Sequence, residues 1–101
     1  MRETGKYGFT AKLVKELKEL FPGCIVLHND PQMIQGIPDL VILFEDRWAA
    51  LESKAWERAR RRPNQEHYVN LLDDMSFAAF ISPDNKEEVL YGLQLAFGTR
   101  R

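Results

Sequence analysis

The stretch GIPDLVILFEDRWAALESK, residues 36–54, decides the fold of this chain. Residues 40–44 form a nearly continuous apolar run, which predicts a strand that is covered on both faces. The polar residues 45–47 predict a turn, and residues 48–54 predict the antiparallel partner strand. Polar residues occupy the open end of this predicted hairpin: Pro38, Asp39, Glu52, Ser53 and Lys54.

The register of the hairpin determines which polar side chains meet. Glu52 and Lys54 are two positions apart, so they project from the same face of a strand. A two-residue turn at residues 45–46 places Asp39 opposite Glu52, whereas a turn at residues 46–47 places it opposite Lys54. Either turn brings the three side chains onto one face, within about 5–8 Å of each other.

The flanking sequence predicts an α/β fold, a mixed sheet flanked by helices. Helices are predicted over residues 9–20, from Pro63 onward, and after a capping box of Asp84 and Glu87. Short apolar runs predict two further strands, at residues 24–27 and 77–81. The expected order is therefore helix, three strands, helix, strand, helix, in a single domain of residues 1–101.

Composition limits the possible functions. The chain has 101 residues, enough for one core, and its formal net charge of −1 gives no overall attraction to nucleic acid. No apolar run approaches the roughly 20 residues of a membrane span, so no membrane partner is expected. A single cysteine, Cys24, excludes an internal disulfide. Without a recognisable export signal, the expected location is the cytoplasm.

The polar residues at the open end of the hairpin suit phosphodiester hydrolysis. Two carboxylates at this range repel each other unless a cation lies between them, and oxygen ligands favour Mg²⁺ or Mn²⁺. The metal ligands would be Asp39, Glu52 and the backbone carbonyl of Ser53. Lys54 could hold or deprotonate an attacking water, or offset charge on the phosphorane. Gln65 shares the inner face of its helix and could contact the metal cluster or simply cap the helix.

The chain resembles the PD-(D/E)XK nucleases, and within them the virus-type replication-repair nuclease (VRR-NUC) domain. The matching blocks are Gly36-Ile37-Pro38-Asp39-Leu40, Leu51-Glu52-Ser53-Lys54 and Arg62-Pro63-Asn64-Gln65. The resemblance implies a restriction-endonuclease-like core in the order α-β-β-β-α-β-α. It also implies that Asp39 and Glu52 bind metal, that Lys54 is catalytic, and that Gln65 borders the site.

The chain departs from the family pattern at two places. Ser53 stands where an apolar residue is usual, a change that a carbonyl ligand would survive. The family tends to carry a supporting Glu on its first helix, and Glu3 is the nearest candidate, although it could equally be a terminal acid with no role.

Arginine is concentrated just after the predicted catalytic strand, at Arg58, Arg60, Arg61 and Arg62. These side chains could bind DNA phosphates without sequence preference, or could form a solvated loop. His28 follows the first strand and could touch a phosphate or be purely structural. Trp56 could stack at a branch point, pack in the core or form a dimer contact.

These observations predict a Mg²⁺- or Mn²⁺-dependent DNA endonuclease. By the family resemblance, the substrate is branched DNA such as a four-way junction, and the protein is a homodimeric, junction-resolvase-like enzyme. Small members are often carried by phages, which would place the enzyme in the host cytoplasm. A flap or linear-duplex nuclease and a catalytically silent DNA-binding module are the rival functions. Apolar candidates for the dimer interface are Trp48, Trp56, Tyr68, Leu90, Leu93 and Phe97, with burial as the alternative for Leu93 and Phe97.

Overall fold

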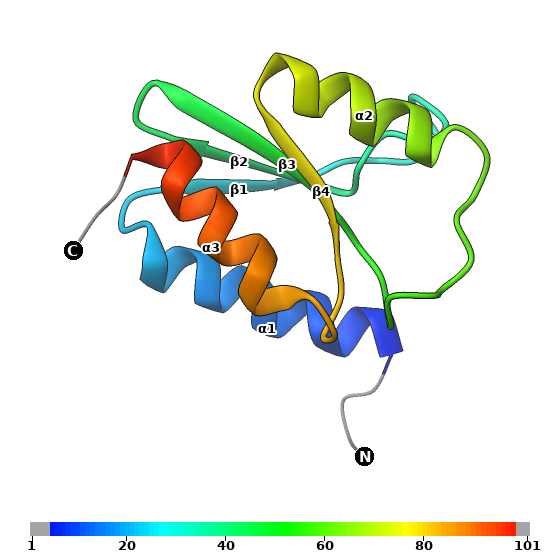
Figure 1. Ribbon diagram of the computed structural model, residues 1–101, viewed down its shortest axis with the longest axis horizontal. Helices are drawn as coiled ribbons and strands as arrows, with labels where there is room; N and C mark the ends of the chain where they lie inside the picture. Colours follow the sequence, from blue (N-terminus) through cyan, green and yellow to red (C-terminus); the bar gives the residue numbers. More distant parts are fainter. Residues whose placement is uncertain (1–4, 99–101) are drawn as a thin grey trace.

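A computed structural model describes residues 5–98 as an α/β fold of three helices and one four-stranded sheet (Figure 1). The elements are α1 (Gly5–Leu20), β1 (Ile25–His28), β2 (Leu40–Phe44), β3 (Arg47–Ser53), α2 (Gln65–Met75), β4 (Phe77–Ile81) and α3 (Lys86–Phe97). The predicted order of elements is confirmed.

The sheet is mixed and lies between two helical layers. Its strand order is β1-β2-β3-β4, in which β1, β2 and β3 are antiparallel neighbours and β4 runs parallel to β3. Helix α2 connects β3 to β4 and covers one face, while α1 and α3 cover the other (Figure 1). This agrees with the predicted mixed sheet flanked by helices.

The β2–β3 hairpin has the first of the two predicted registers. Phe44 pairs with Arg47, so the turn consists of Glu45 and Asp46. Glu45 has a φ of 57°, the left-handed conformation that tight hairpin turns require. The ladder continues to Leu40 opposite Leu51, which leaves Asp39 and Glu52 facing each other at the open end.

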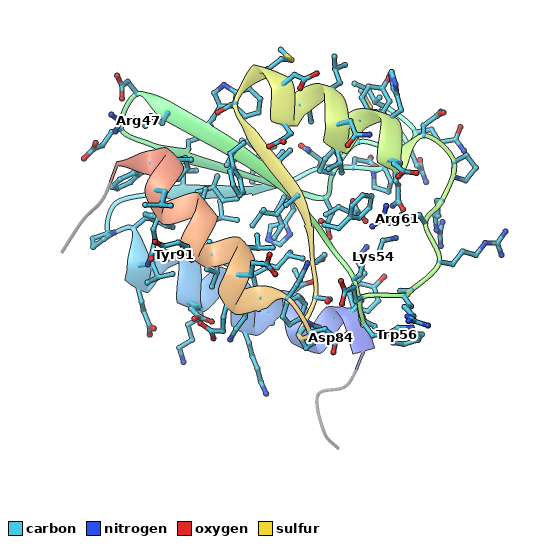
Figure 2. All side chains as sticks on the ribbon, viewed as in Figure 1. Arg47, Lys54, Trp56, Arg61, Asp84 and Tyr91 are labelled. Carbon is cyan, nitrogen blue, oxygen red and sulfur yellow. The ribbon has the colours of Figure 1, made fainter. Side chains whose placement is uncertain are left out.

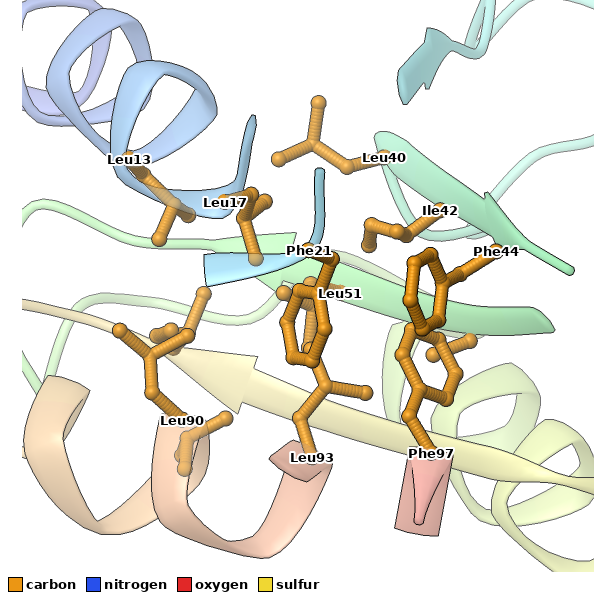
Figure 3. Packing of buried hydrophobic residues seen from close by; sticks show 13 residues of the cluster. Leu13, Leu17, Phe21, Leu40, Ile42, Phe44, Leu51, Leu90, Leu93 and Phe97 are labelled. Atoms are coloured by element: carbon orange, nitrogen blue, oxygen red, sulfur yellow. The ribbon is translucent and has the colours of Figure 1, made fainter. Parts of the chain in front are cut away.

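The main core lies between the sheet and the layer of α1 and α3. Phe21, Phe44 and Phe97 pack together there, with ring centroids 5.0–5.6 Å apart (Figure 3). Leu90 and Leu93 belong to the same cluster and are buried, like Phe97. The prediction that Leu90, Leu93 and Phe97 could form a dimer surface is therefore wrong, because α3 uses this stripe to cover the sheet.

Two helix starts differ from the prediction. Helix α2 begins at Gln65 rather than Pro63, because Asn64 adopts a left-handed φ of 70°. Helix α3 begins at Lys86 after Asn85, and the predicted capping box is not formed. Instead, Asp84 accepts a hydrogen bond from the backbone N–H of Glu57, at 2.7 Å. Within residues 5–98, no helix is both long enough and apolar enough to span a membrane.

Candidate active site

Asp39 and Glu52 are joined by backbone hydrogen bonds at the open end of the hairpin. The N–H of Asp39 donates to Glu52 Oε1 at 3.1 Å, and the N–H of Ser53 donates to Asp39 Oδ1 at 3.0 Å. The Ser53 hydroxyl donates to Asp39 Oδ2 at 2.6 Å and lies 2.8 Å from Thr10 Oγ1 on α1. These reciprocal bonds fix both carboxylates relative to the ends of β2 and β3.

Gln65 connects the carboxylate pair to Lys54. Its Nε2 donates to Glu52 Oε2 at 2.9 Å, and its Oε1 accepts from Lys54 Nζ at 2.7 Å. The same Oε1 accepts from the N–H of Arg62, also at 2.7 Å. Lys54 Nζ also donates to the carbonyl of Arg60 at 3.0 Å and lies 3.9 Å from Glu52 Oε2. The amide orientation is set by these donors and acceptors, so Gln65 acts as a polar bridge between a buried acid and a buried base.

Gly36 holds the start of α2 against the loop that precedes β2. Its φ is +93°, and a Cβ placed there would lie 2.6 Å from the Cβ of Asn64. A larger residue would have to push Asn64 away, and with it the adjacent Gln65. Asn29 fixes the same loop by donating from Nδ2 to the carbonyl of Pro38, at 2.8 Å. The Gly-x-Pro-Asp segment therefore has a structural role in positioning Asp39 and Gln65.

Two charged groups of the site, Glu52 and Lys54, are buried, and burial moves their pKa values. Glu52 is 2% exposed, and desolvation, followed by the nearby charge of Asp39, raises the pKa of its carboxyl. Lys54 is 8% exposed, and desolvation lowers the pKa of its ammonium group against the opposing attraction of Glu52. Both shifts bring the acid and the base closer to neutral forms, which suits proton transfer.

A cleft of about 730 Å³ opens above these residues. Asp39, Glu52, Lys54 and Gln65 line it together with Arg60 and Arg62. The loop that carries the two arginines connects β3 to α2 and lies beside Lys54 (Figure 2). The cleft is thus lined by a carboxylate pair, a lysine and two arginines.

The other predicted DNA-binding residues lie elsewhere. Arg61 turns away from the cleft and places its guanidinium 3.7 Å above the ring of Phe80, with Glu66 at 3.4 Å. Arg58 is exposed but does not line the cleft. His28 is exposed and lines a neighbouring hollow that also reaches Asp39. The four arginines are therefore not equivalent.

The position between the two carboxylates already attracts a cation. Lys6 Nζ, from α1, lies 3.6 Å from Asp39 Oδ2 and 3.6 Å from Glu52 Oε2. These two oxygens are suitable ligands for Mg²⁺ or Mn²⁺. The N–H of Ser53 donates to Asp39, so the backbone of Ser53 lies beside this carboxylate, and its carbonyl stays the candidate for a third ligand.

The donor set fits a hard divalent cation, but it is small. Among residues 5–98, no group of three or more His, Cys, Asp or Glu side chains is arranged to hold a metal. Water and phosphate oxygens would have to complete the shell, as is usual for Mg²⁺. The candidate ligand Glu3 lies outside the described residues.

Sequence reasoning missed Lys6 and the hydroxyl of Ser53. Lys6 and Thr10 continue the buried stripe of Leu13 and Leu17 along the same face of α1. The position of these two polar residues at the end of the buried stripe could have indicated that they face the site. Ser53 was considered only for its carbonyl, whereas its hydroxyl links Asp39 to α1.

Comparisons of the chain with models of protein families, with curated proteins and with solved structures find no match. What the site can do therefore has to be inferred from its own residues.

Proposed function

We propose that this protein is a metal-dependent endodeoxyribonuclease with a restriction-endonuclease-like core. The observation that carries the proposal is the hydrogen-bonded network of half-buried Asp39 with buried Glu52, Lys54 and Gln65 at the base of an arginine-lined cleft. The resemblance of the Gly-Ile-Pro-Asp-Leu and Glu-Ser-Lys segments to VRR-NUC nucleases supports the same function. Burying charges costs stability, so a network retained only for the fold would be unfavourable.

Each residue has a chemical role in this proposal. Asp39 and Glu52 would hold a divalent cation, which supplies Lewis-acid polarisation of the phosphate and a more acidic water. Lys54, whose pKa is lowered by burial, takes or holds a proton of the attacking water. Gln65 keeps Lys54 beside Glu52 through two hydrogen bonds. Arg60 and Arg62 bind the flanking phosphates.

The proposed substrate is branched DNA, and the preferred branched structure is a four-way junction. The test offers junction, flap and linear duplex DNA of shared sequence to the protein with Mg²⁺, Mn²⁺, Ca²⁺ or excess chelator. Junction cleavage with Mg²⁺ or Mn²⁺, and binding with little cutting in Ca²⁺, is the expected result. Full cleavage in chelator would overturn the metal mechanism. Binding of DNA without cleavage under any condition would favour a silent DNA-binding module.

We also propose a homodimer, through the uncovered part of the sheet. On the face that carries α2, β1 and β2 expose Ile25, Leu27 and Leu43 to 55%, 45% and 37%. Strand β1 is an edge strand, and its sequence IVLH has neither the charge nor the proline that usually protects such edges. Packing this face against the same face of a second copy about a twofold axis would cover the apolar side chains and give two active sites for two cuts, whereas pairing of the β1 edges alone would only extend the sheet.

Sedimentation equilibrium at micromolar concentration tests the dimer. The parent protein should sediment as a dimer, and Leu27→Lys should sediment as a monomer that nicks one strand of a junction. A parent protein that remains monomeric with and without DNA would rule out the dimer and the paired cuts, while leaving the nuclease proposal intact.

A further inference from the structure

A second hollow joins the cleft at the carboxylates and has a different chemical character. It has a volume of about 530 Å³ and is bordered by α1 and by the residues that follow β1. Asp39 and Lys6 line both the cleft and this hollow. Any group bound here would therefore lie next to a phosphate bound at Asp39.

The surface of this hollow is mainly apolar, although Lys6, Thr10, Asn29 and Asp39 also line it. Ala11, Val14 and Pro31 provide aliphatic surface, and Tyr7 and His28 provide two rings. Tyr7 is 88% exposed, and it lines both the cleft and this hollow. The arginines Arg60 and Arg62 line only the cleft. One side thus suits a charged backbone, and the other suits a flat apolar group.

We propose that this second hollow, the Tyr7 hollow, binds the unstacked nucleobase next to the scissile phosphate. The inference rests on the proposed nuclease function and identifies what the enzyme recognises in its substrate. Exposed aromatic rings beside a backbone-binding groove bind bases by stacking, largely without regard to sequence. A base within intact duplex is paired and stacked on both sides, so it cannot enter the hollow without being flipped out. Bases at a branch point or flap enter more readily, which would give selectivity for DNA structure.

A binding experiment tests the hollow without cleavage. A single-stranded oligonucleotide carries 2-aminopurine, whose fluorescence falls when it stacks on an aromatic ring, and is titrated with protein in chelator. The parent protein and Tyr7→Phe should quench the signal, and Tyr7→Ala should lose most of the quenching. Tyr91→Ala is the matched control, since Tyr91 is 63% exposed on α3, far from Lys54 (Figure 2). Equal quenching by Tyr7→Ala and the parent protein would overturn the proposal.

A cleavage experiment tests the consequence for selectivity. The branched DNA that the parent cuts fastest, junction or flap, and linear duplex DNA with the same sequence around the cut are compared in Mg²⁺, and the ratio of the two rates is measured. Loss of one base stack should lower this ratio by at least about fivefold in Tyr7→Ala, while Tyr7→Phe and Tyr91→Ala keep it. If the parent enzyme cuts DNA and Tyr7→Ala leaves the ratio unchanged, the base-binding role of the Tyr7 hollow is wrong, while the nuclease proposal stands. A parent protein that quenches 2-aminopurine yet cuts no DNA refutes the nuclease but not the hollow.

Discussion

The two ends of the β2–β3 hairpin are built from the same pair of strands but treat charge in opposite ways. At the closed end, Arg47 pairs with Glu45 and Asp46 at 3.6 and 4.0 Å, and all three side chains are between 46% and 90% exposed. At the open end, Glu52 Oε2 and Lys54 Nζ lie 3.9 Å apart, and both side chains are buried. Figure 2 shows Arg47 and Lys54 well apart, at the two ends of β3.

The difference separates exposed ion pairs from buried charges. Exposed ion pairs like those of Arg47 contribute about 0–1 kcal/mol, so their loss should matter little. Buried charges must be paired and hydrogen-bonded to be tolerated, and the open end meets this requirement with Gln65, Ser53 and Lys6. This cost is borne at the open end of the hairpin, which is the end where we propose the active site.

The largest expected effect is on catalysis. Asp39→Asn should reduce DNA cleavage by about 10³-fold or more, because it removes one of two charges that attract the metal. Asparagine can still accept the N–H of Ser53, so the fold should persist. Asp46→Asn, at the closed end, is the matched control and should retain parental rates. Cleavage rates with Mg²⁺ are measured beside circular dichroism; near-parental cleavage by Asp39→Asn would remove Asp39 from the mechanism.

Replacing one glycine near each end of the sheet should lower the stability of the protein by different amounts. Gly23 and Gly36 have nearly equal φ values of +91° and +93°, but only Gly36 would meet a neighbour within 4 Å. Gly23→Ala should cost about 1–2 kcal/mol for the left-handed backbone. Gly36→Ala should cost a further ~1–3 kcal/mol from overpacking against Asn64, and should also impair cleavage by shifting Gln65.

Denaturant unfolding of both glycine variants measures the difference. Equal losses of stability would mean that the contact between Gly36 and Asn64 is easily relieved. Loss of cleavage in Gly23→Ala would contradict the assignment of the active site to the open end.

Arginines at the two ends of the hairpin should differ in their contribution to DNA binding. Replacing Arg60 and Arg62 with Ala should weaken binding by about tenfold and lower the log–log salt slope by about two, one for each phosphate contact. Arg47→Ala, at the closed end, should leave the slope unchanged.

Arg61→Ala should instead cost about 0.5–1 kcal/mol of stability, because its guanidinium stacks on Phe80.

Fluorescence anisotropy over a range of salt concentrations separates these arginine variants. A slope that falls as much in Arg61→Ala as in the double variant would mean that Arg61 leaves Phe80 to bind DNA. An unchanged slope in the double variant would make the cleft wall a solvated surface.

The sequence predicted the residues at the open end of the hairpin better than it predicted the residues that hold them in place. Apolar runs on either side of a short polar turn are local signals, and they left two registers open, of which the one with Asp39 opposite Glu52 is observed. The start of α2 was misplaced because a left-handed Asn64 depends on its contact with Gly36, which is distant in sequence. Lys6 was missed for a related reason, since only the packing of α1 brings it to the carboxylates. Contacts between distant segments were thus the part that local patterns could not give.

The smallest expected effect concerns how stability depends on pH at the open end. Burial and Asp39 raise the pKa of Glu52 in the folded protein above its usual range. Between the usual and the raised pKa, the folded state binds more protons than the unfolded state, so the free energy of unfolding falls as pH rises through this window. One proton limits this slope to about 1.4 kcal/mol per pH unit. Glu52→Gln should remove this contribution, which is measured as the difference between parent and variant unfolding in chelator. Added Mg²⁺ should reverse the trend in the parent protein, because a cation favours the ionised carboxyl, and a parent and variant with parallel pH profiles would show that Glu52 does not titrate in this way.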